Sequence, residues 1–191
     1  GLEITDEMRL VIALQASLLV SQRDPGAYAS LYSVLVYPDE FVAPERDEDE
    51  SGVVTEGEHA LSGQTLDTDR IVLSWRDVQE SGVGDDAYNV VLHEFAHYLD
   101  HSLEGAITAP LKEQRELADW HRGLLHEYEA LCGAVERGED TLIDPYGAEE
   151  PAEFFAVATE TFFEQPRELA QHHPALYAAL RDFYALDPAR W

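Results

Sequence analysis

The sequence has 191 residues, of which 45% are hydrophobic and 27% are charged, as in an ordinary folded globular protein. It holds 39 Asp and Glu residues against 12 Lys and Arg residues, so its formal net charge is −27. A chain this acidic repels nucleic-acid phosphates and anionic membrane surfaces, and we expect neither as a partner. The acidic excess is interpreted as a solvated surface and indicates no particular activity.

The sequence has a single cysteine, Cys132, which excludes a disulfide within these residues. It lies in the apolar stretch "YEALCGAV" and is interpreted as a buried structural thiol rather than a nucleophile. No signal peptide is evident, and the most apolar early run, residues 8–20, is too short to cross a bilayer. We therefore expect a cytoplasmic protein.

The first part of the sequence predicts a helix followed by strands. Residues 5–20 form the expected helix, with Thr5 or Asp6 as its N-cap. Its expected apolar face consists of Leu10, Ile12, Ala13, Leu14 and Leu18. Stretches rich in β-branched residues predict strands at "SVLVY" (33–37), "GVVTE" (52–56) and "RIVLSW" (70–75). The charged residues 44–52 predict a loop.

The second part predicts helices. One follows the turn "SGVGDD", where Asp85 or Asp86 is the expected cap, and runs to about Leu103. A long amphipathic helix is expected over about 111–137, ended by Gly138. Its expected apolar face consists of Leu117, Trp120, Leu124, Tyr128, Leu131 and Val135. Two more helices are expected, one from Pro151 to just before Pro166 and one over "PALYAALRDFYAL". A helix, then strands, then helices predicts a single α+β domain over residues 1–191.

The stretch "NVVLHEFAHYLD" (89–100) contains the pattern H-E-x-x-H. On a helix, His93 and His97 lie on one face, one turn apart, so their imidazoles can converge on one metal ion. Leu92, Ala96, Leu99 and Leu103 form a separate stripe that anchors the helix in the core. Glu94 points beside the metal, where it can accept a proton from a metal-activated water. The pattern is typical of zinc peptidases.

A catalytic zinc site normally has a third protein ligand. The pattern H-E-x-x-H-x-x-G-x-x-H is excluded because Asp100 and Leu103 stand where it needs Gly and His. A glutamate from a later helix is the remaining common solution. The candidates are Glu113, Glu116, Glu149, Glu150, Glu153 and Glu160.

Glu153 has the most suggestive surroundings of these candidates. It falls in the first turn of a very apolar helix, where a carboxylate is costly unless a cation neutralises it. Glu160, on the same helix face, is expected to orient a ligand histidine through a hydrogen bond, and Asp100 is a second candidate for that role. Tyr146, seven residues before Glu153, is a candidate hydrogen-bond donor to the oxyanion of a tetrahedral intermediate.

"NVVLHEFAHYLD" together with "YGAEEPAEFFAVATETFFE" resembles the family of Mlc titration factor A, a group of bacterial zinc-dependent metallopeptidases. The pieces "VYPDEF", "ALSG" and "IVLSW" are similar to the same family, which in turn resembles the catalytic domain of anthrax lethal factor. The resemblance covers about residues 4–188. It implies a zincin-like domain in which a small sheet accompanies the helix that carries the histidines.

The resemblance also implies roles. His93, His97 and Glu153 would hold one Zn²⁺ ion, Glu94 would be the general base, and Tyr146 would stabilise the transition state. "LSGQTL" stands where a Gly-Glu-Ala-Trp-like segment is expected, so substrate contacts are expected to differ. The N-terminal helical stretch usual in the family is expected to be absent.

We expect a peptide or protein substrate lying extended beside "RIVLSW", read as an edge strand. The family name comes from binding a glucose-responsive transcriptional repressor, which is a possible partner. One alternative is therefore a non-catalytic module that sequesters a regulator and has a structural or vestigial metal site. The other is a zinc hydrolase acting on non-peptide amides.

Overall fold

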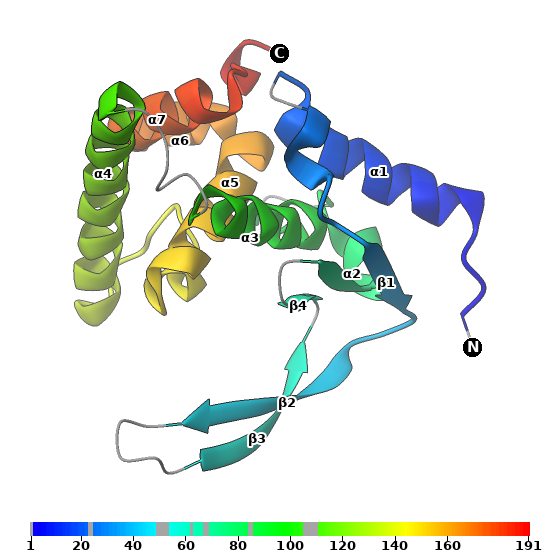
Figure 1. Cartoon of the computed structure of the whole chain (residues 1–191). Coiled ribbons are helices and arrows are strands. Elements are labelled where there is room, and N and C mark those ends of the chain that lie inside the picture. Colours follow the sequence, from blue (N-terminus) through cyan, green and yellow to red (C-terminus); the bar gives the residue numbers. More distant parts are fainter. Residues whose placement is uncertain are drawn as a thin grey trace.

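The computed structural model describes residues 2–22, 25–48, 54–61, 63–66, 69–83, 86–104 and 111–191. The described part is mostly helical, with little β-structure (Figure 1). The helices are α1 (Asp6–Val20), α2 (Trp75–Glu80), α3 (Val90–Glu104), α4 (Leu111–Glu136), α5 (Pro151–Glu164), α6 (Pro166–His172) and α7 (Pro174–Tyr184). Short 3₁₀ turns are η1 (Pro25–Tyr28), η3 (Pro145–Ala148) and η4 (Pro188–Arg190).

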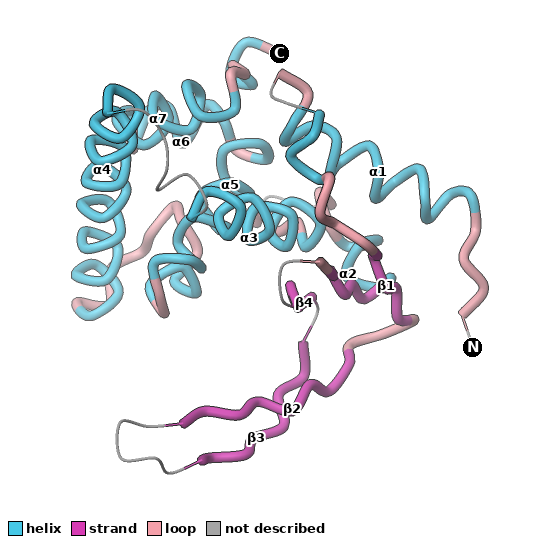
Figure 2. The backbone as a smooth tube through the Cα atoms, in the orientation of Figure 1, coloured by secondary structure: helices cyan, strands magenta, loops and turns pink. Residues whose placement is uncertain are grey.

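The strands fall into two groups (Figure 2). They are β1 (Ser33–Tyr37), β2 (Phe41–Glu48), β3 (Val54–Leu61), β4 (Gly63–Leu66) and β5 (Arg70–Ser74). β1, β5 and β4 form a three-stranded sheet in that order, with β1 parallel and β4 antiparallel to β5. β2 and β3 pair as an antiparallel ribbon that extends away from the helices (Figures 1 and 2).

This topology corrects three predictions. The stretch 70–74 is the central strand of its sheet and not an edge strand, because β1 and β4 pair with its two sides. Trp75, expected in that strand, begins α2, which Ser74 caps by accepting a hydrogen bond from the Asp77 amide. The charged stretch 44–52 is not all loop, since residues up to Glu48 belong to β2. Charged side chains favour exposure to solvent but do not prevent the backbone from pairing, so a charged stretch can still form a strand.

The predicted first helix is present, but its buried face is different. Thr5 is the N-cap, as expected, and accepts a hydrogen bond from the amide of Met8. The buried residues of α1 are Met8, Ile12, Ala16 and Leu19, whereas Leu10 and Leu14 are 59% and 63% exposed. The predicted set mixed two faces of a helix that is apolar on nearly every side, so periodicity alone could not select the buried one.

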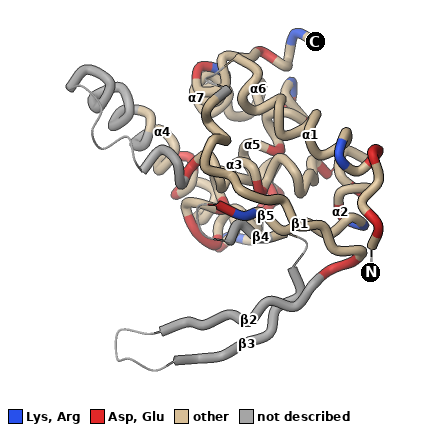
Figure 3. Tube along the Cα trace, turned by 45° about the vertical axis from the view of Figure 1, so that its right-hand side comes forward, with Lys and Arg blue, Asp and Glu red and all other residues tan. Residues whose placement is uncertain are grey.

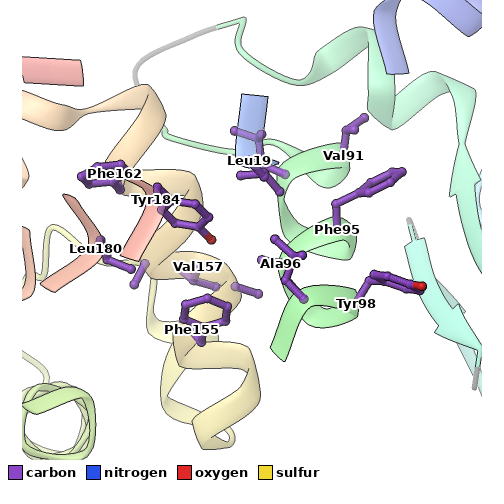
Figure 4. Close-up of a cluster of buried hydrophobic side chains, with 14 of the residues drawn as sticks. Leu19, Val91, Phe95, Ala96, Tyr98, Phe155, Val157, Phe162, Leu180 and Tyr184 are labelled. Carbon is purple, nitrogen blue, oxygen red and sulfur yellow. The ribbon is translucent and has the colours of Figure 1, made fainter. Parts of the chain in front are cut away.

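The main core lies between α3 and α5, with α1 and α7 packed around them (Figure 4). Leu19 of α1 meets Val91 and Phe95 of α3, while Phe155 and Phe162 of α5 lie toward Leu180 and Tyr184 of α7 (Figure 4). The Tyr184 hydroxyl is buried and hydrogen-bonded to the Thr159 hydroxyl at 2.8 Å. α5 is consequently buried along almost its whole length, and its few polar side chains need partners inside the protein.

The helix boundaries in the second part agree closely with the sequence. α4 stops at Glu136, and Gly138 follows with a left-handed φ of 68°. Leu124 and Leu131 on its predicted apolar face are buried, and the side chain of Leu117 lies outside the described ones.

Cys132 is only half-buried, not fully buried as expected, and its thiol lies 3.6 Å from the Ala148 carbonyl. Asp and Glu outnumber Lys and Arg along the described trace (Figure 3). None of the helices searched in the described part is both long and apolar enough for a bilayer.

Candidate metal centre

Two histidines project from one face of α3. The Nε2 atoms of His93 and His97 lie 3.1 Å apart, and their ring centroids are 4.7 Å apart. The neighbouring stripe of α3, Leu92, Ala96 and Leu99, is buried in the core as predicted, while the side chain of Leu103 is not among those described. Because the apolar stripe fixes the rotation of the helix, the two imidazoles are held facing the same point.

The glutamate that meets the histidine pair comes from α5. Oε2 of Glu153 lies 3.0 Å from Nε2 of His93, and its Oε1 lies 3.4 Å from Nε2 of His97. α5 begins at Pro151, so Glu153 sits in its first turn, where α5 packs against α3. Each of the three residues offers one donor atom, and these atoms all lie within 4.8 Å of one another.

A second carboxylate of α5 lies behind His93. Oε1 of Glu160 is 2.7 Å from Nδ1 of His93, and its Oε2 accepts a hydrogen bond from the backbone amide of Asn89. Glu160 is only 5% exposed, and burial raises its pKa against the effect of these two donors. Because the carboxylate accepts, the proton of a neutral His93 belongs on Nδ1, and the lone pair of Nε2 faces Glu153 and His97.

Asn89 closes the same network at the start of α3. Its Oδ1 accepts from the Leu92 amide at 3.1 Å, and its Nδ2 donates to Oε1 of Glu164 at 2.7 Å. Asn89 therefore caps this helix. The prediction that Asp86 is the cap is wrong, because Asp86 accepts a hydrogen bond from the Tyr88 amide instead. Asp85, the other predicted cap, lies outside the described residues. Sequence reasoning missed Asn89 and Glu164, although an asparagine just before an apolar periodic run is a recognised N-cap signal.

The charges at this centre depend on each other. Burial lowers the pKa of His93, but the hydrogen bonds with Glu153 and then Glu160 outweigh it and raise that pKa to about 10. Burial likewise raises the pKa of Glu153, but the hydrogen bonds from His93 and His97 outweigh it and lower that pKa to about 2. Without a cation, the centre is therefore an imidazolium facing a carboxylate.

The donor set fits a metal ion. Two imidazole nitrogens and one carboxylate oxygen are a common ligand set for zinc. When His93 is neutral and carries its proton on Nδ1, its Nε2 cannot donate to the buried Oε2 of Glu153, which lies 3.0 Å away. A buried carboxylate oxygen without an aligned donor is stabilised by a cation placed between it and the two imidazoles.

Glu94 and Tyr146, the two predicted catalytic residues, lie around this centre. Glu94 is 5% exposed, and its charge raises the pKa of both His93 and Tyr146, so its carboxylate is within electrostatic reach of both. Tyr146 lies in η3, where Asp144 accepts a hydrogen bond from its amide at 2.8 Å. Its ring centroid is 6.1 Å from that of His93. Burial and then the nearby carboxylates, Glu153 first, raise the pKa of the Tyr146 hydroxyl.

The remaining candidates differ in placement. Glu149 and Glu150 are exposed residues just before α5. Glu113 and Glu116 lie on α4, and their side chains fall outside the described ones. Asp100 is half-buried on α3, and its role in orienting a ligand histidine stays a prediction.

A mostly helical protein with a small sheet and a His–His–Glu cluster compatible with a metal ion is metallopeptidase-like. The chain belongs to the glucose-regulated metallo-peptidase M90 family, whose model matches residues 1–185.

Sequence comparison with individual proteins supports this family assignment. The chain is 40% identical to Mlc titration factor A of Pectobacterium atrosepticum over 188 residues, which is 97% of this chain and 71% of the relative. Mlc titration factor A of Serratia proteamaculans is 36% identical over 191 residues, 98% of this chain and 72% of the relative. An uncharacterized protein of Synechocystis is 39% identical over 189 residues, 97% of this chain and 68% of the relative. The resemblance seen in the sequence is confirmed.

Proposed function

We propose that the chain is a zinc-dependent peptidase with a single zincin-like domain, in which His93, His97 and Glu153 hold one Zn²⁺ ion. The observation that carries the proposal is the convergence of three donor atoms, from two helices, within 4.8 Å. The buried Glu160 behind His93 supports it, because ligand histidines usually donate their second ring N–H to a carboxylate or carbonyl. Membership of a metallo-peptidase family supports the class.

Zinc, when bound, would supply a Lewis acid that polarises the peptide carbonyl and acidifies the attacking water. Glu94 takes the proton from that water and passes it to the leaving amine. Tyr146 donates a hydrogen bond from its hydroxyl to the developing oxyanion, and its raised pKa keeps it protonated for this role. Because β5 is central in its sheet, we place the extended peptide beside β4, the edge strand that contacts α3.

The test combines metal analysis with hydrolysis. Purified protein should contain about one zinc per chain, and it should cleave members of a peptide library in a reaction that a chelator stops and added zinc restores. Glu94→Gln should keep the metal and lose about 10²-fold or more in kcat. A metal-replete protein that cleaves no peptide would refute the proposal, and cleavage of non-peptide amides alone would redirect it to another substrate class.

A second candidate function is suggested by the names of the relatives, which are called Mlc titration factor A. In this reading the chain binds a transcriptional regulator and the metal site is structural. Binding of purified Mlc by the wild type and by Glu94→Gln, measured by calorimetry, would test it. A buried Glu94 beside the candidate centre favours the peptidase, since a structural site requires no general base. A cytoplasmic location stays a prediction that accompanies either function.

A further inference from the structure

One glycine of the edge strand lies against the side chain of Glu94. Gly63 begins β4 and pairs with Leu73 of β5. A Cβ atom placed on Gly63 would lie 2.5 Å from Oε1, 2.6 Å from Cγ and 2.8 Å from Cδ of Glu94. All three distances are far shorter than any normal contact between such atoms, so a side chain at position 63 and the present position of Glu94 exclude each other.

The backbone conformation does not explain this glycine. Gly82 and Gly138 have left-handed φ values of 69° and 68°, which favour glycine over other residues. Gly63 instead lies in a β-strand, outside the left-handed region, and any residue can adopt that conformation. A glycine within a strand weakens it, and often marks a place where another group must approach closely. Here the approaching group is the carboxylate arm of Glu94.

The contact also shows what a larger residue would disturb. The three atoms nearest to a Cβ placed at position 63 all belong to the side chain of Glu94. A glutamate side chain can turn about its own bonds, while the paired backbone of β4 and β5 need not move. The fold should therefore tolerate alanine at this position, and the conflict should be relieved by rotation of the Glu94 carboxylate.

We propose that Gly63 is a positioning residue for Glu94: its lack of a side chain lets the carboxylate occupy the space between α3 and the edge strand, beside the candidate metal centre. This inference rests on the proposed function, since it treats Glu94 as the group that handles the proton of the attacking water. It assigns a role to Gly63 in the segment "LSGQTL", whose difference from the family pattern had suggested altered substrate contacts.

The first experiment compares Gly63→Ala with Gly123→Ala. Gly123 is an exposed glycine of α4 with no atom within 4 Å of a Cβ placed on it, so it controls for the substitution itself. Gly63→Ala should lower kcat about 10²-fold or more, as expected for loss of a general base, with KM and zinc affinity unchanged. Gly123→Ala should leave all three unchanged. Full kcat in Gly63→Ala, or a loss of zinc affinity that accounts for the lost activity, would overturn the inference.

A double-mutant cycle tests whether Gly63 acts through Glu94. In the Glu94→Gln background, Gly63→Ala should cause no further loss in kcat, because the group that it displaces no longer acts as a base. An equal loss in both backgrounds would show a general structural effect and would overturn the proposal.

A crystal structure of Gly63→Ala separates the two proposals. If the wild type cleaves no peptide, the proposed function fails, and the position of Glu94 in the variant still tests the contact. A Glu94 side chain turned away from β4 supports the role of Gly63 as a spatial constraint. A Glu94 side chain in its wild-type position overturns it.

Discussion

Nδ1 of His93 lies 2.7 Å from Oε1 of Glu160, so one carboxylate of α5 supports this histidine from behind while another, Glu153, faces it in front. The two glutamates are seven residues apart, two turns along one helix face. The apolar packing between α3 and α5 sets the distance at which both reach the histidine. The geometry of the candidate centre is thus fixed by helix packing and not by a loop.

Glu160→Gln should weaken zinc binding by about 10- to 100-fold, as changes to the groups behind ligand histidines commonly do. The carboxylate accepts from both His93 and the Asn89 amide, whereas a glutamine has only one oxygen for these two donors. Zinc affinity is measured by competition with a chromogenic chelator. The control is Glu164→Gln, because Glu164 contacts Asn89 and the glutamine oxygen can still accept that bond. Equal zinc affinity in Glu160→Gln and the wild type would remove Glu160 from this role.

Glu153→Ala should bind zinc much more weakly than the wild type, because two imidazoles alone rarely hold the ion. Glu150→Ala is the matched control, since Glu150 is an exposed residue three positions earlier that makes no side-chain cap to α5. Metal content after dialysis against a weak chelator distinguishes the variants. Unchanged zinc content in Glu153→Ala would move the third ligand to Glu116 or Glu160.

Tyr146→Phe should lower kcat by about 10²-fold and leave zinc affinity unchanged, because the variant loses one hydrogen-bond donor to the oxyanion but no metal ligand. Steady-state hydrolysis of a peptide found in the library screen provides the measurement. Tyr32→Phe, which removes the hydroxyl of an 83% exposed tyrosine, is the control. An unchanged kcat in Tyr146→Phe would show that the Tyr146 hydroxyl does not stabilise the oxyanion.

The stability of the metal-free protein should depend on pH through His93 and Glu153. The pKa of His93 rises from 6.5 to about 10 on folding, so its contribution is complete below pH 6.5 and disappears as pH rises through 10. The pKa of Glu153 falls from 4.5 to about 2, so its contribution is complete above pH 4.5 and disappears as pH falls through 2. The pair therefore stabilises most between pH 4.5 and 6.5.

Urea unfolding of chelator-treated protein across this pH range tests the prediction. The difference in unfolding free energy between wild type and His93→Gln should be largest in that window and should shrink toward alkaline pH. His173→Gln, which changes a histidine paired with Glu127 away from the centre, should not reproduce this alkaline dependence. A wild-type advantage over His93→Gln that grows with pH would contradict the assigned ionisation states.

Leu19→Ala should destabilise the protein by about 2–5 kcal/mol, because Leu19 is fully buried between α1 and α3. Leu14→Ala, on the same helix, should change stability by less than about 0.5 kcal/mol, because Leu14 is 63% exposed. Urea unfolding of both variants checks the face of α1 that the structure assigns to the core. Similar losses for the two variants would show that the leucine face predicted from the sequence also packs.

Features that depend only on neighbouring residues could be predicted from the sequence. The spacing of His93 and His97 on a helix, the Thr5 cap, the end of α4 before Gly138 and the start of α5 at Pro151 follow from periodicity and capping chemistry, which are local. The family resemblance also came from the sequence.

Features that depend on how distant segments pack became clear only from the three-dimensional structure. The sequence already favoured Glu153 as the third ligand and expected Glu160 to orient a ligand histidine, and the structure brings both to His93 and adds Asn89. The structure chose the buried face of α1 and put β5 in the centre of its sheet. It also brought Gly63 against Glu94, thirty-one positions later in the sequence. The cause is that the hydrophobic effect has no direction. An apolar pattern predicts that a helix or strand face is buried, but which residues of other segments cover that face depends on how the whole chain packs.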